Sequence, residues 1–420
     1  MKLSKIRDIV SLFAVLVSVG ADAQTLNLKS CIDEALRNNP DIRSITLKVE
    51  RSQKSLEQQK SIQRPQISVW GEYDPLKTYV IPISGKFNTL DDDGWSVGVS
   101  ARQRVYDFGT TTHKIEASRT KKRGSVLTLK EAKALLVYTV KKAYASAISL
   151  QDALTVRQKD LEVKKALYEQ AKAMVAQGLK SPADESRFLS SVKAAQEAVA
   201  KAESDYKKGI YILEKLMAVS LRESVELDSS GVFKEKADIP ATYTEILKEN
   251  LSIKIARNEQ KAAHESYKSA RAERYGTIDA IAEAAHFDTL NSYDTKLIAL
   301  RYTVPLYSGG AVKAKKEQAR IEELIAAEET TSKKLQLTEE IKSLLSDIEA
   351  LDRSIEARKA QLDSADVTAE VVGARYKEGL ATYIEVLDAE AVRLEAKLAL
   401  ILARYAKAEK IFRLEYLNAK

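Results

Sequence analysis

The sequence predicts an α+β membrane protein made of two structural repeats, each with a pair of β-strands and a long antiparallel hairpin of coiled-coil helices. Three observations predict this fold class. Short motifs recur at a spacing of 201 residues, as expected when one long unit occurs twice in a chain. The stretches 136–175 and 337–376 carry apolar residues with a period of about 3.5, which is typical of a left-handed coiled coil. Four short segments alternate apolar and polar residues, the pattern of half-buried strands.

The repeat divides the chain into two halves. The segment 105–109 (Val-Tyr-Asp-Phe-Gly) aligns with 306–310 (Leu-Tyr-Ser-Gly-Gly). We assign residues 24–231 to the first repeat and 232–420 to the second, each with the order helix, strand pair, long helical hairpin. Further matches upstream have a spacing of 211 instead of 201: Leu36 with Leu247, Asn39 with Asn250, and Ile42 with Ile253.

The segment 1–23 has the features of a secretory signal peptide. It has a basic start, an apolar stretch at 9–19 and a small-x-small cleavage site that ends at Ala23. The apolar stretch is too short to span a membrane comfortably, which makes a short membrane anchor the weaker interpretation. Cys31 lies eight residues beyond Ala23, so we expect no lipid attachment at the mature N-terminus.

Composition and motifs exclude several classes of protein. The net charge is +7 over 420 residues and no basic patch is interleaved with aromatics, so nucleic acid is not an expected partner. The lone Cys31 cannot form an internal disulfide. His113, His264 and His286 lack metal-ligand spacing, and the chain has no phosphate loop or nucleophile elbow. We therefore expect no enzymatic activity, no cofactor and no metal site.

One long helix is predicted in each repeat. No proline lies between Pro82 and Pro182, so residues from about 110 to 177 could form a helix roughly 100 Å long. Ten of the twelve seam positions between 136 and 175 are apolar. Arg157 and its equivalent Arg358 interrupt the two seams at the same place, and we expect each stem to lie along its seam with the guanidinium in water.

Each long helix is predicted to end in a turn that contains glycine, at 177–182 and at 378–382. Glycine suits a helix C-terminus, and Ser181-Pro182 or Thr382 can begin the return helix. The first return helix does not keep the register of the second at the spacing of 201. The two hairpins are therefore expected to be similar but not equivalent.

The clearest strand is the segment 95–103, whose apolar and polar residues alternate without a break. The equivalent strand of the second copy is predicted at 298–304. Partner strands are predicted at 67–71 and 277–284, with polar loops at about 74–93 and 285–295. We expect the apolar faces to contact lipid: Trp95, Val97 and Val99 in the first copy, and Ile298, Leu300 and Tyr302 in the second.

Nine residues match one crossing of an outer-membrane-type barrel. No stretch of about 18 apolar residues follows the signal segment, so this chain could enter a membrane only as a closed β-barrel. A soluble sheet that packs through its aromatics is the alternative. Four strands cannot close a barrel, because the smallest single-chain bacterial barrels have eight, and open sheet edges do not occur in lipid. The sequence therefore predicts that other copies of the chain complete the sheet.

Over residues 25–418 the chain resembles the TolC family of outer-membrane efflux proteins. The matching motifs are Pro65-Gln66-Ile67 at the first strand and the two segments 105–109 and 306–310. The most specific match is 375–389, Arg-Tyr-Lys-Glu-Gly-Leu-Ala-Thr-Tyr-Ile-Glu-Val-Leu-Asp-Ala, which is close to the family pattern Y-x-x-G-x-x-[ST]-x-x-[DE]-V-L-D-A.

The resemblance implies a homotrimer with a shared twelve-stranded barrel in outer-membrane lipid and an α-helical barrel, or tunnel, across the periplasm. It also implies a periplasmic membrane-fusion adaptor and an inner-membrane pump of the RND or ABC type. The expected function is a channel-tunnel of a tripartite efflux or type I secretion system. Drugs, metals and secreted polypeptides are all compatible substrates.

The resemblance also assigns roles to residues at the helical tips. The expected adaptor-docking residues are Gly178, Leu179, Gly379 and Leu380. The expected residues of a periplasmic gate are Asp184, Tyr376, Glu385 and Asp388. One departure concerns Ala381, which stands where a family member has an arginine, so a gating salt bridge through that position is not expected.

Two alternatives stay open. Glu385 and Asp388 could be ordinary acidic residues in the first turns of a helix, where they favour its positive end. The whole chain could also be a soluble coiled-coil scaffold of the cell envelope, although that alternative does not account for the four alternating strands.

Overall fold

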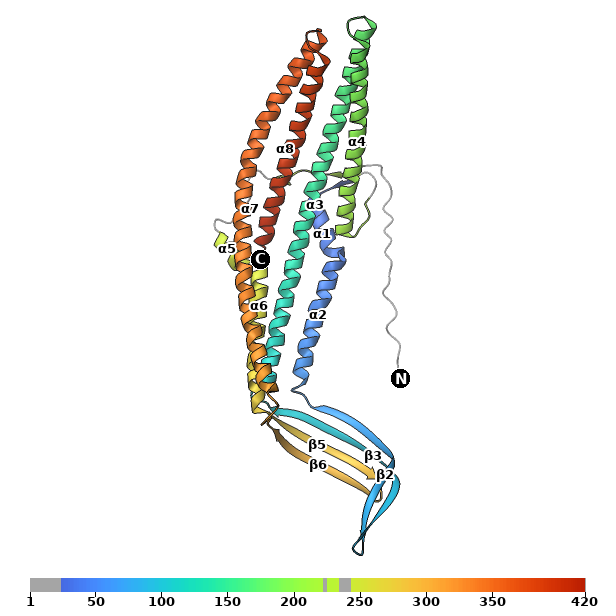
Figure 1. The fold of residues 1–420 in the computed structure, drawn as a ribbon, viewed down its shortest axis with the longest axis vertical. Helices are drawn as coiled ribbons and strands as arrows, with labels where there is room; N and C mark the ends of the chain where they lie inside the picture. The colour runs from blue at the N-terminus through green and yellow to red at the C-terminus, as the bar shows by residue number, and fades with distance from the viewer. Residues whose placement is uncertain (1–23, 222–224, 234–242, 420) are drawn as a thin grey trace.

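The computed structural model describes residues 24–221, 225–233 and 243–419. The predicted signal segment, 1–23, lies outside the described residues. The described chain is a long rod of helices with a β-sheet at one end and two helical tips at the other (Figure 1).

The helices confirm the prediction of one uninterrupted rod in each half. The long helices α3 (Thr110–Ala176) and α7 (Ala311–Lys377) have 67 residues each, which corresponds to roughly 100 Å. Shorter helices lie before and after them: α1 (Leu28–Asn38), α2 (Pro40–Ser61) and α4 (Pro182–Met217) in the first half, and α5 (Tyr243–Glu249), α6 (Leu251–Ala272) and α8 (Tyr383–Leu417) in the second.

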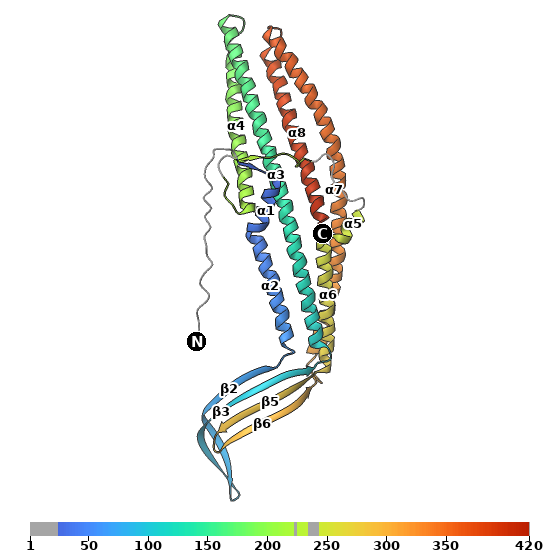
Figure 2. The same ribbon diagram turned by 180° about the vertical axis from the view of Figure 1, so that it is seen from behind.

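The helices form a curved wall rather than a compact bundle. Helices α3 and α7 run its whole length, with α4 and α8 beside them toward the tips and α2 and α6 toward the sheet (Figures 1 and 2). Neighbouring helices pack in the order α4–α3–α8–α7 in the half near the tips and α2–α3–α6–α7 in the half near the sheet. The apolar seam of α7 is buried in this packing, including Leu337, Ile341, Leu344 and Ile348.

Two asparagines show how closely the two halves correspond. The Asn39 side chain donates to the Leu216 carbonyl at 3.0 Å, and the Asn250 side chain donates to the Leu417 carbonyl at 2.9 Å. Both asparagines are buried and cap the helix that follows them. Each ties the start of a lower helix to the end of an upper one, which keeps the wall continuous at mid-length.

A small parallel sheet covers α3 at this level. It pairs β1 (Gln24–Leu26) with β4 (Val225–Leu227). The buried Tyr144 of α3 donates its hydroxyl toward the carbonyls of Leu26 at 2.6 Å and Asp228 at 2.9 Å. One phenol therefore holds both backbone segments against the helix.

Tyr144→Phe should lower stability by about 0.5–1.5 kcal/mol, the usual net contribution of a hydrogen bond, because it removes the donor to the Asp228 carbonyl and leaves the Leu26 carbonyl with only the Asp228 N–H. Chemical denaturation followed by circular dichroism measures this change. Tyr211→Phe, at an exposed position of α4, is the matched control and should have almost no effect. Equal midpoints for the two variants would contradict the role of the Tyr144 hydroxyl.

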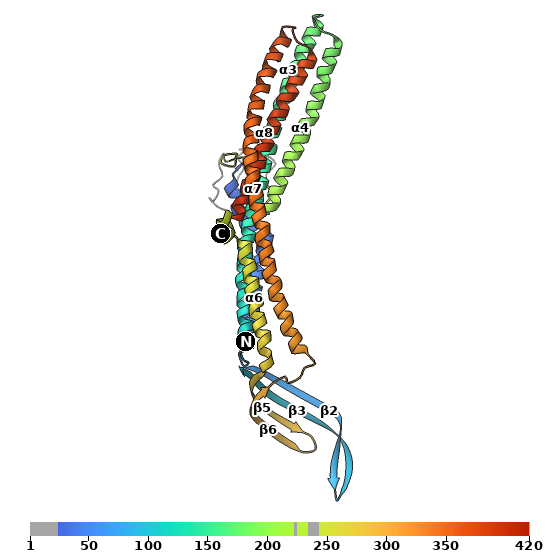
Figure 3. The ribbon, with the colours of Figure 1, turned by 60° about the vertical axis from the view of Figure 1, so that its left-hand side comes forward.

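The main sheet has four antiparallel strands in the order β2-β3-β5-β6 (Figure 3). Its strands are β2 (Gln66–Ile83), β3 (Lys86–Tyr106), β5 (Thr277–Asp288) and β6 (Ser292–Thr303). All four predicted strands are present, but the predicted loops at 74–93 and 285–295 are wrong. The strands continue through most of both stretches, and the connections are only Ser84-Gly85 and 289–291.

The physical reason is that alternation disappears where each face of a strand mixes polar and apolar residues. Beyond Asp74 the β2–β3 hairpin carries exposed apolar residues such as Leu76, Val80 and Phe87 among lysines and aspartates, so no period of two remains to detect. Pro75 lacks the N–H that a strand ladder needs. A register shift between Asp74 and Lys77 accommodates this proline.

The two faces of the sheet differ in character. Cross-strand partners share a face, and the register places Val97 and Val99 of β3 on the same face as Ile298 and Leu300 of β6. These side chains are exposed, and Ile298 is 91% exposed. On the opposite face the buried Asp279 carboxylate accepts from Arg102 at 2.9 Å and Arg104 at 3.3 Å.

Candidate functional site

The site is built on the two helical tips, which end in the same backbone geometry. Gly178 and Gly379 adopt left-handed φ values of 71° and 78°, which an L side chain rarely adopts. In each tip the next amide reaches back to the helix end, from Leu179 to the Met174 carbonyl at 2.9 Å and from Leu380 to the Arg375 carbonyl at 2.8 Å. This pattern is the glycine C-cap that the sequence predicted.

The predicted docking residues lie at the outermost point of each hairpin. Leu179 and Leu380 are each 63% exposed, although both are large apolar side chains. No atom lies within 4 Å of the position that a Cβ would take at either glycine, apart from chain neighbours. Each tip therefore presents an open backbone turn beside an exposed leucine.

Behind the tips lies a buried aromatic cluster that joins the two hairpins. It contains Ala171, Phe188, Tyr376, Ala381 and Val386. The Tyr376 and Phe188 rings meet edge to face with centroids 5.6 Å apart. Helices from both repeats contribute to this cluster, so it holds the first tip against the second.

Tyr376 is fully buried, and its hydroxyl has no hydrogen-bond partner among the described residues. Burial raises the pKa of Tyr376, and the nearby Asp184 carboxylate raises it further. The tyrosine is therefore neutral near pH 7. The structure brings these two predicted gate residues close together.

Glu385 and Asp388 lie in the first turns of α8, and both are exposed. Glu385 closes a capping box: its carboxylate accepts from the Thr382 backbone N–H at 2.7 Å, and its own N–H donates to the Thr382 hydroxyl at 3.3 Å. The hydrogen bond from the Thr382 N–H, followed by that from its hydroxyl, lowers the pKa of Glu385. Glu385 thus serves the helix start, as one of the two sequence interpretations expected.

Sequence reasoning missed three contributors to this site: Phe188, the burial of Ala381, and Lys180. The Lys180 ammonium lies over the Tyr376 ring, 5.2 Å from its centroid, and donates to the Ala381 carbonyl at 3.4 Å. The repeat offered one sequence signal for Lys180, because this residue is the equivalent of Ala381 at the spacing of 201.

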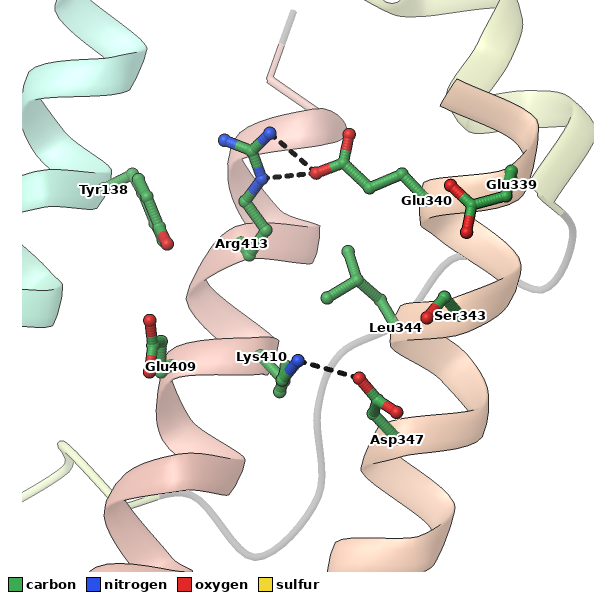
Figure 4. A pocket seen from close by; sticks show the side chains of 9 residues that line it. All are labelled: Tyr138, Glu339, Glu340, Ser343, Leu344, Asp347, Glu409, Lys410 and Arg413. Atoms are coloured by element: carbon green, nitrogen blue, oxygen red, sulfur yellow. Dashed lines mark hydrogen bonds and ion pairs between the residues drawn. The ribbon is translucent and has the colours of Figure 1, made fainter. Parts of the chain in front are cut away.

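A second candidate lies at mid-length, where a cavity of about 340 Å³ opens between α3, α7 and α8 (Figure 4). Its lining is charged, and ion pairs join Arg413 to Glu340 at 2.6 Å and Lys410 to Asp347 at 2.7 Å. These pairs connect neighbouring helices of the wall. We interpret the cavity as a groove open to solvent beside the two ion pairs that join α7 and α8.

In the part of the chain that the structure describes, no three His, Cys, Asp or Glu side chains are grouped so that they could hold a metal ion. None of the described helices combines the length and the apolar character that a membrane crossing requires.

Comparison with known proteins identifies the family. The family model described as "Outer membrane efflux protein" matches residues 31–218 and 242–417, which is most of the chain. This chain belongs to the outer membrane efflux protein family. The two matched segments coincide with the two halves of the wall, and the interruption falls at the segment between them.

Relatives and solved structures agree with this membership. Outer membrane protein TolC of Salmonella enteritidis is 24% identical over 406 residues, covering 91% of this chain and 80% of the relative. A crystal structure of CusC has a TM-score of 0.83 at 20% identity and covers 96% of this chain and 95% of its own. The outer membrane protein VceC of Vibrio cholerae has a TM-score of 0.79 at 18% identity, covering 93% and 96%.

Membership confirms several predictions from the sequence. The protein is a TolC-family outer-membrane efflux channel and not an enzyme. Its fold of a helical wall with an antiparallel sheet is the fold of those solved channels. The alternative of a soluble scaffold is therefore the weaker one.

Proposed function

We propose that three copies of this chain form one channel-tunnel, with a shared barrel in the outer membrane and a helical tunnel in the periplasm. Substrates pass through it from a periplasmic adaptor and an inner-membrane pump of the RND or ABC type. The observation that carries the proposal is a four-stranded sheet with one largely apolar, exposed face and two edges that are unpaired within the described chain.

The edges of the sheet support the oligomer. In the described chain β2 pairs only with β3, and β6 pairs only with β5. Unpaired backbone N–H and C=O groups are not tolerated in the hydrocarbon of a bilayer. Three copies supply twelve strands, an even number within the range of bacterial barrels, and the family resemblance selects three over two.

The helical wall also has edges that would be covered by a neighbour. Helix α7 forms one edge of the wall, both in the part near the tips and in the part near the sheet. It carries large apolar side chains that are exposed in the single chain. These residues are Ile321, Leu324, Leu335, Val367 and Val371. Exposed apolar patches of this kind mark interaction surfaces, and α4 and α2 at the opposite edge of the wall would cover them.

The tips would be the periplasmic end of the tunnel. The exposed Leu179 and Leu380 would enter pockets of the adaptor, and the open glycine turns would let its backbone approach. The buried cluster around Tyr376 would keep the hairpins together and the entrance narrow. Asp184 and Asp388 would contribute negative charge near that entrance.

Membrane fractionation tests the proposal. We expect the protein in outer-membrane detergent extracts as a heat-resistant trimer that conducts ions when placed in a planar bilayer. The matched comparison is the same protein in the periplasmic fraction. A monodisperse soluble rod there, with none in the outer membrane, would instead support a cell-envelope scaffold.

The double variant Glu385→Ala, Asp388→Ala should lower cation selectivity and weaken block by trivalent cations. The reason is that three copies would bring six carboxylates near the tunnel axis, and carboxylate rings favour cations. The effect should shrink as salt rises, because exposed charges are screened over about 10 Å at 0.1 M ionic strength. The single variant Glu385→Ala should do less than Asp388→Ala, since the Glu385 carboxylate is engaged in the capping box. Unchanged selectivity in the double variant would assign both residues to the helix start alone.

A further inference from the structure

One polar contact joins the two tips, and both of its residues lie in the turns between the helices. The Lys180 ammonium donates to the Ala381 carbonyl at 3.4 Å and lies 5.2 Å from the centroid of the Tyr376 ring. Lys180 and Ala381 occupy equivalent positions of the two repeats. The first tip therefore contacts the second at matching points, with the charge supplied only by the first.

The surroundings of Lys180 favour this contact over others. Among the described residues no carboxylate forms an ion pair with Lys180, so the π-face of Tyr376 and the Ala381 carbonyl are its partners there. The tyrosine ring is held in place by burial and by its edge-to-face contact with Phe188. A cation over a fixed aromatic face is attracted by the ring quadrupole. The side chain of Lys180 is half-buried, so water only partly competes for the ammonium.

We propose that Lys180 is a positioning residue that clasps the first helical tip to the second and thereby holds the tunnel entrance narrow. The inference rests on the proposed channel-tunnel and names one device by which its entrance is held. Ala381 cannot supply a charged group to this contact. Threefold symmetry would place three such clasps around the entrance, each of them breakable because it is a single polar contact near solvent.

The clasp depends on the face of the Tyr376 ring and not on its hydroxyl. The hydroxyl has no hydrogen-bond partner among the described residues. Tyr376→Phe keeps the aromatic face and should leave the entrance closed. Tyr376→Leu removes the face and should open it, even though Lys180 is intact.

Single-channel recording of the purified trimer in planar bilayers tests the inference. Lys180→Met keeps the length of the side chain but removes its charge, and we expect a several-fold rise in the conductance or in the time spent open. Lys180→Arg, which retains a cation and donors, should restore the wild-type record. The matched control is Lys172→Met, at an exposed position of α3 near the same tip, and it should not change the record.

The possible outcomes distinguish failure of the clasp from failure of the proposed channel. A closed Lys180→Met channel, an equally open Lys172→Met channel, or an open Lys180→Arg channel would overturn the clasp while the channel-tunnel itself stands. A wild-type protein that forms no conducting trimer would overturn the proposed function, and the clasp with it. Heat resistance of each trimer on gels, which should match the wild type, separates an opened entrance from a misassembled protein. If Lys180→Met fails to assemble, Lys180→Ala, which also removes the ammonium, takes its place beside Lys180→Arg and gives the same decision.

Discussion

Leu380→Asp is expected to abolish efflux while trimers still form in the outer membrane. The leucine is exposed at the end of the second hairpin, beside a glycine turn that is open on all sides. An apolar side chain there can enter a pocket of the adaptor, whereas a carboxylate would have to be desolvated in that pocket without a partner. Accumulation of an efflux substrate in cells measures the loss, and cross-linking to the adaptor locates it.

The matched control is Leu402→Asp in α8. Leu402 is 62% exposed, almost the same as Leu380, but it lies far from the tip. We expect normal efflux and normal cross-linking in this variant. Unchanged adaptor cross-linking in Leu380→Asp would show that the tip is only a turn.

Val97→Arg is expected to impair assembly in the membrane. The cost of an arginine on the lipid face is about 2–4 kcal/mol if the position lies near the bilayer midplane. The position lies on the apolar face of β3, next to a strand partner on each side. The amount of heat-resistant trimer in outer-membrane extracts measures the effect.

Thr295→Arg provides the control for charge alone. Thr295 is an exposed residue of β6, and the register places it with Ala285 and Gly98 on the face opposite Val97. An arginine there would face the interior of the proposed barrel, so we expect nearly normal assembly. A fully stable Val97→Arg trimer, or equal losses in the two variants, would contradict the assignment of the lipid face.

The helical part of the fold was predictable because its signals are local. A 3.5-residue seam, a long stretch without proline and a glycine turn define a hairpin without reference to anything else in the chain. Both long helices and both tips follow from them. The helix starts were equally readable, since Thr382 and Glu385 form the capping box that their spacing of three suggests.

The strands were only partly predictable. Alternation marks a strand when one face is apolar, and it located 95–103 correctly. It failed for the outer part of the β2–β3 hairpin, where Asp91, Asp92 and Asp93 follow one another within a paired strand. A run of acidic residues looks like a loop in sequence, although backbone pairing does not require apolar side chains.

The sequence predicted where the site at the tips lies, but not which of its residues contact one another. The glycine turns and the motif at 375–389 indicated where it lies. The contacts of Tyr376 with Phe188 and Lys180 join segments nearly 200 residues apart along the chain, and no local pattern encodes them. The repeat gave one indication of these contacts, because it aligns Lys180 with Ala381. Only the packing of the two hairpins brings these two residues together.

Cysteine cross-linking between the two free sheet edges tests the central claim most directly. In a Cys31→Ser background the chain has no other cysteine, so Val69→Cys on β2 can be combined in turn with cysteines at 296, 298 and 300 on β6. If three copies share one closed barrel, oxidation of the best pair should give a ladder that ends at three linked chains, and each single-cysteine variant should stay unlinked. A ladder that ends at two, continues beyond three, or never forms in outer membranes that contain the protein would contradict the trimeric channel.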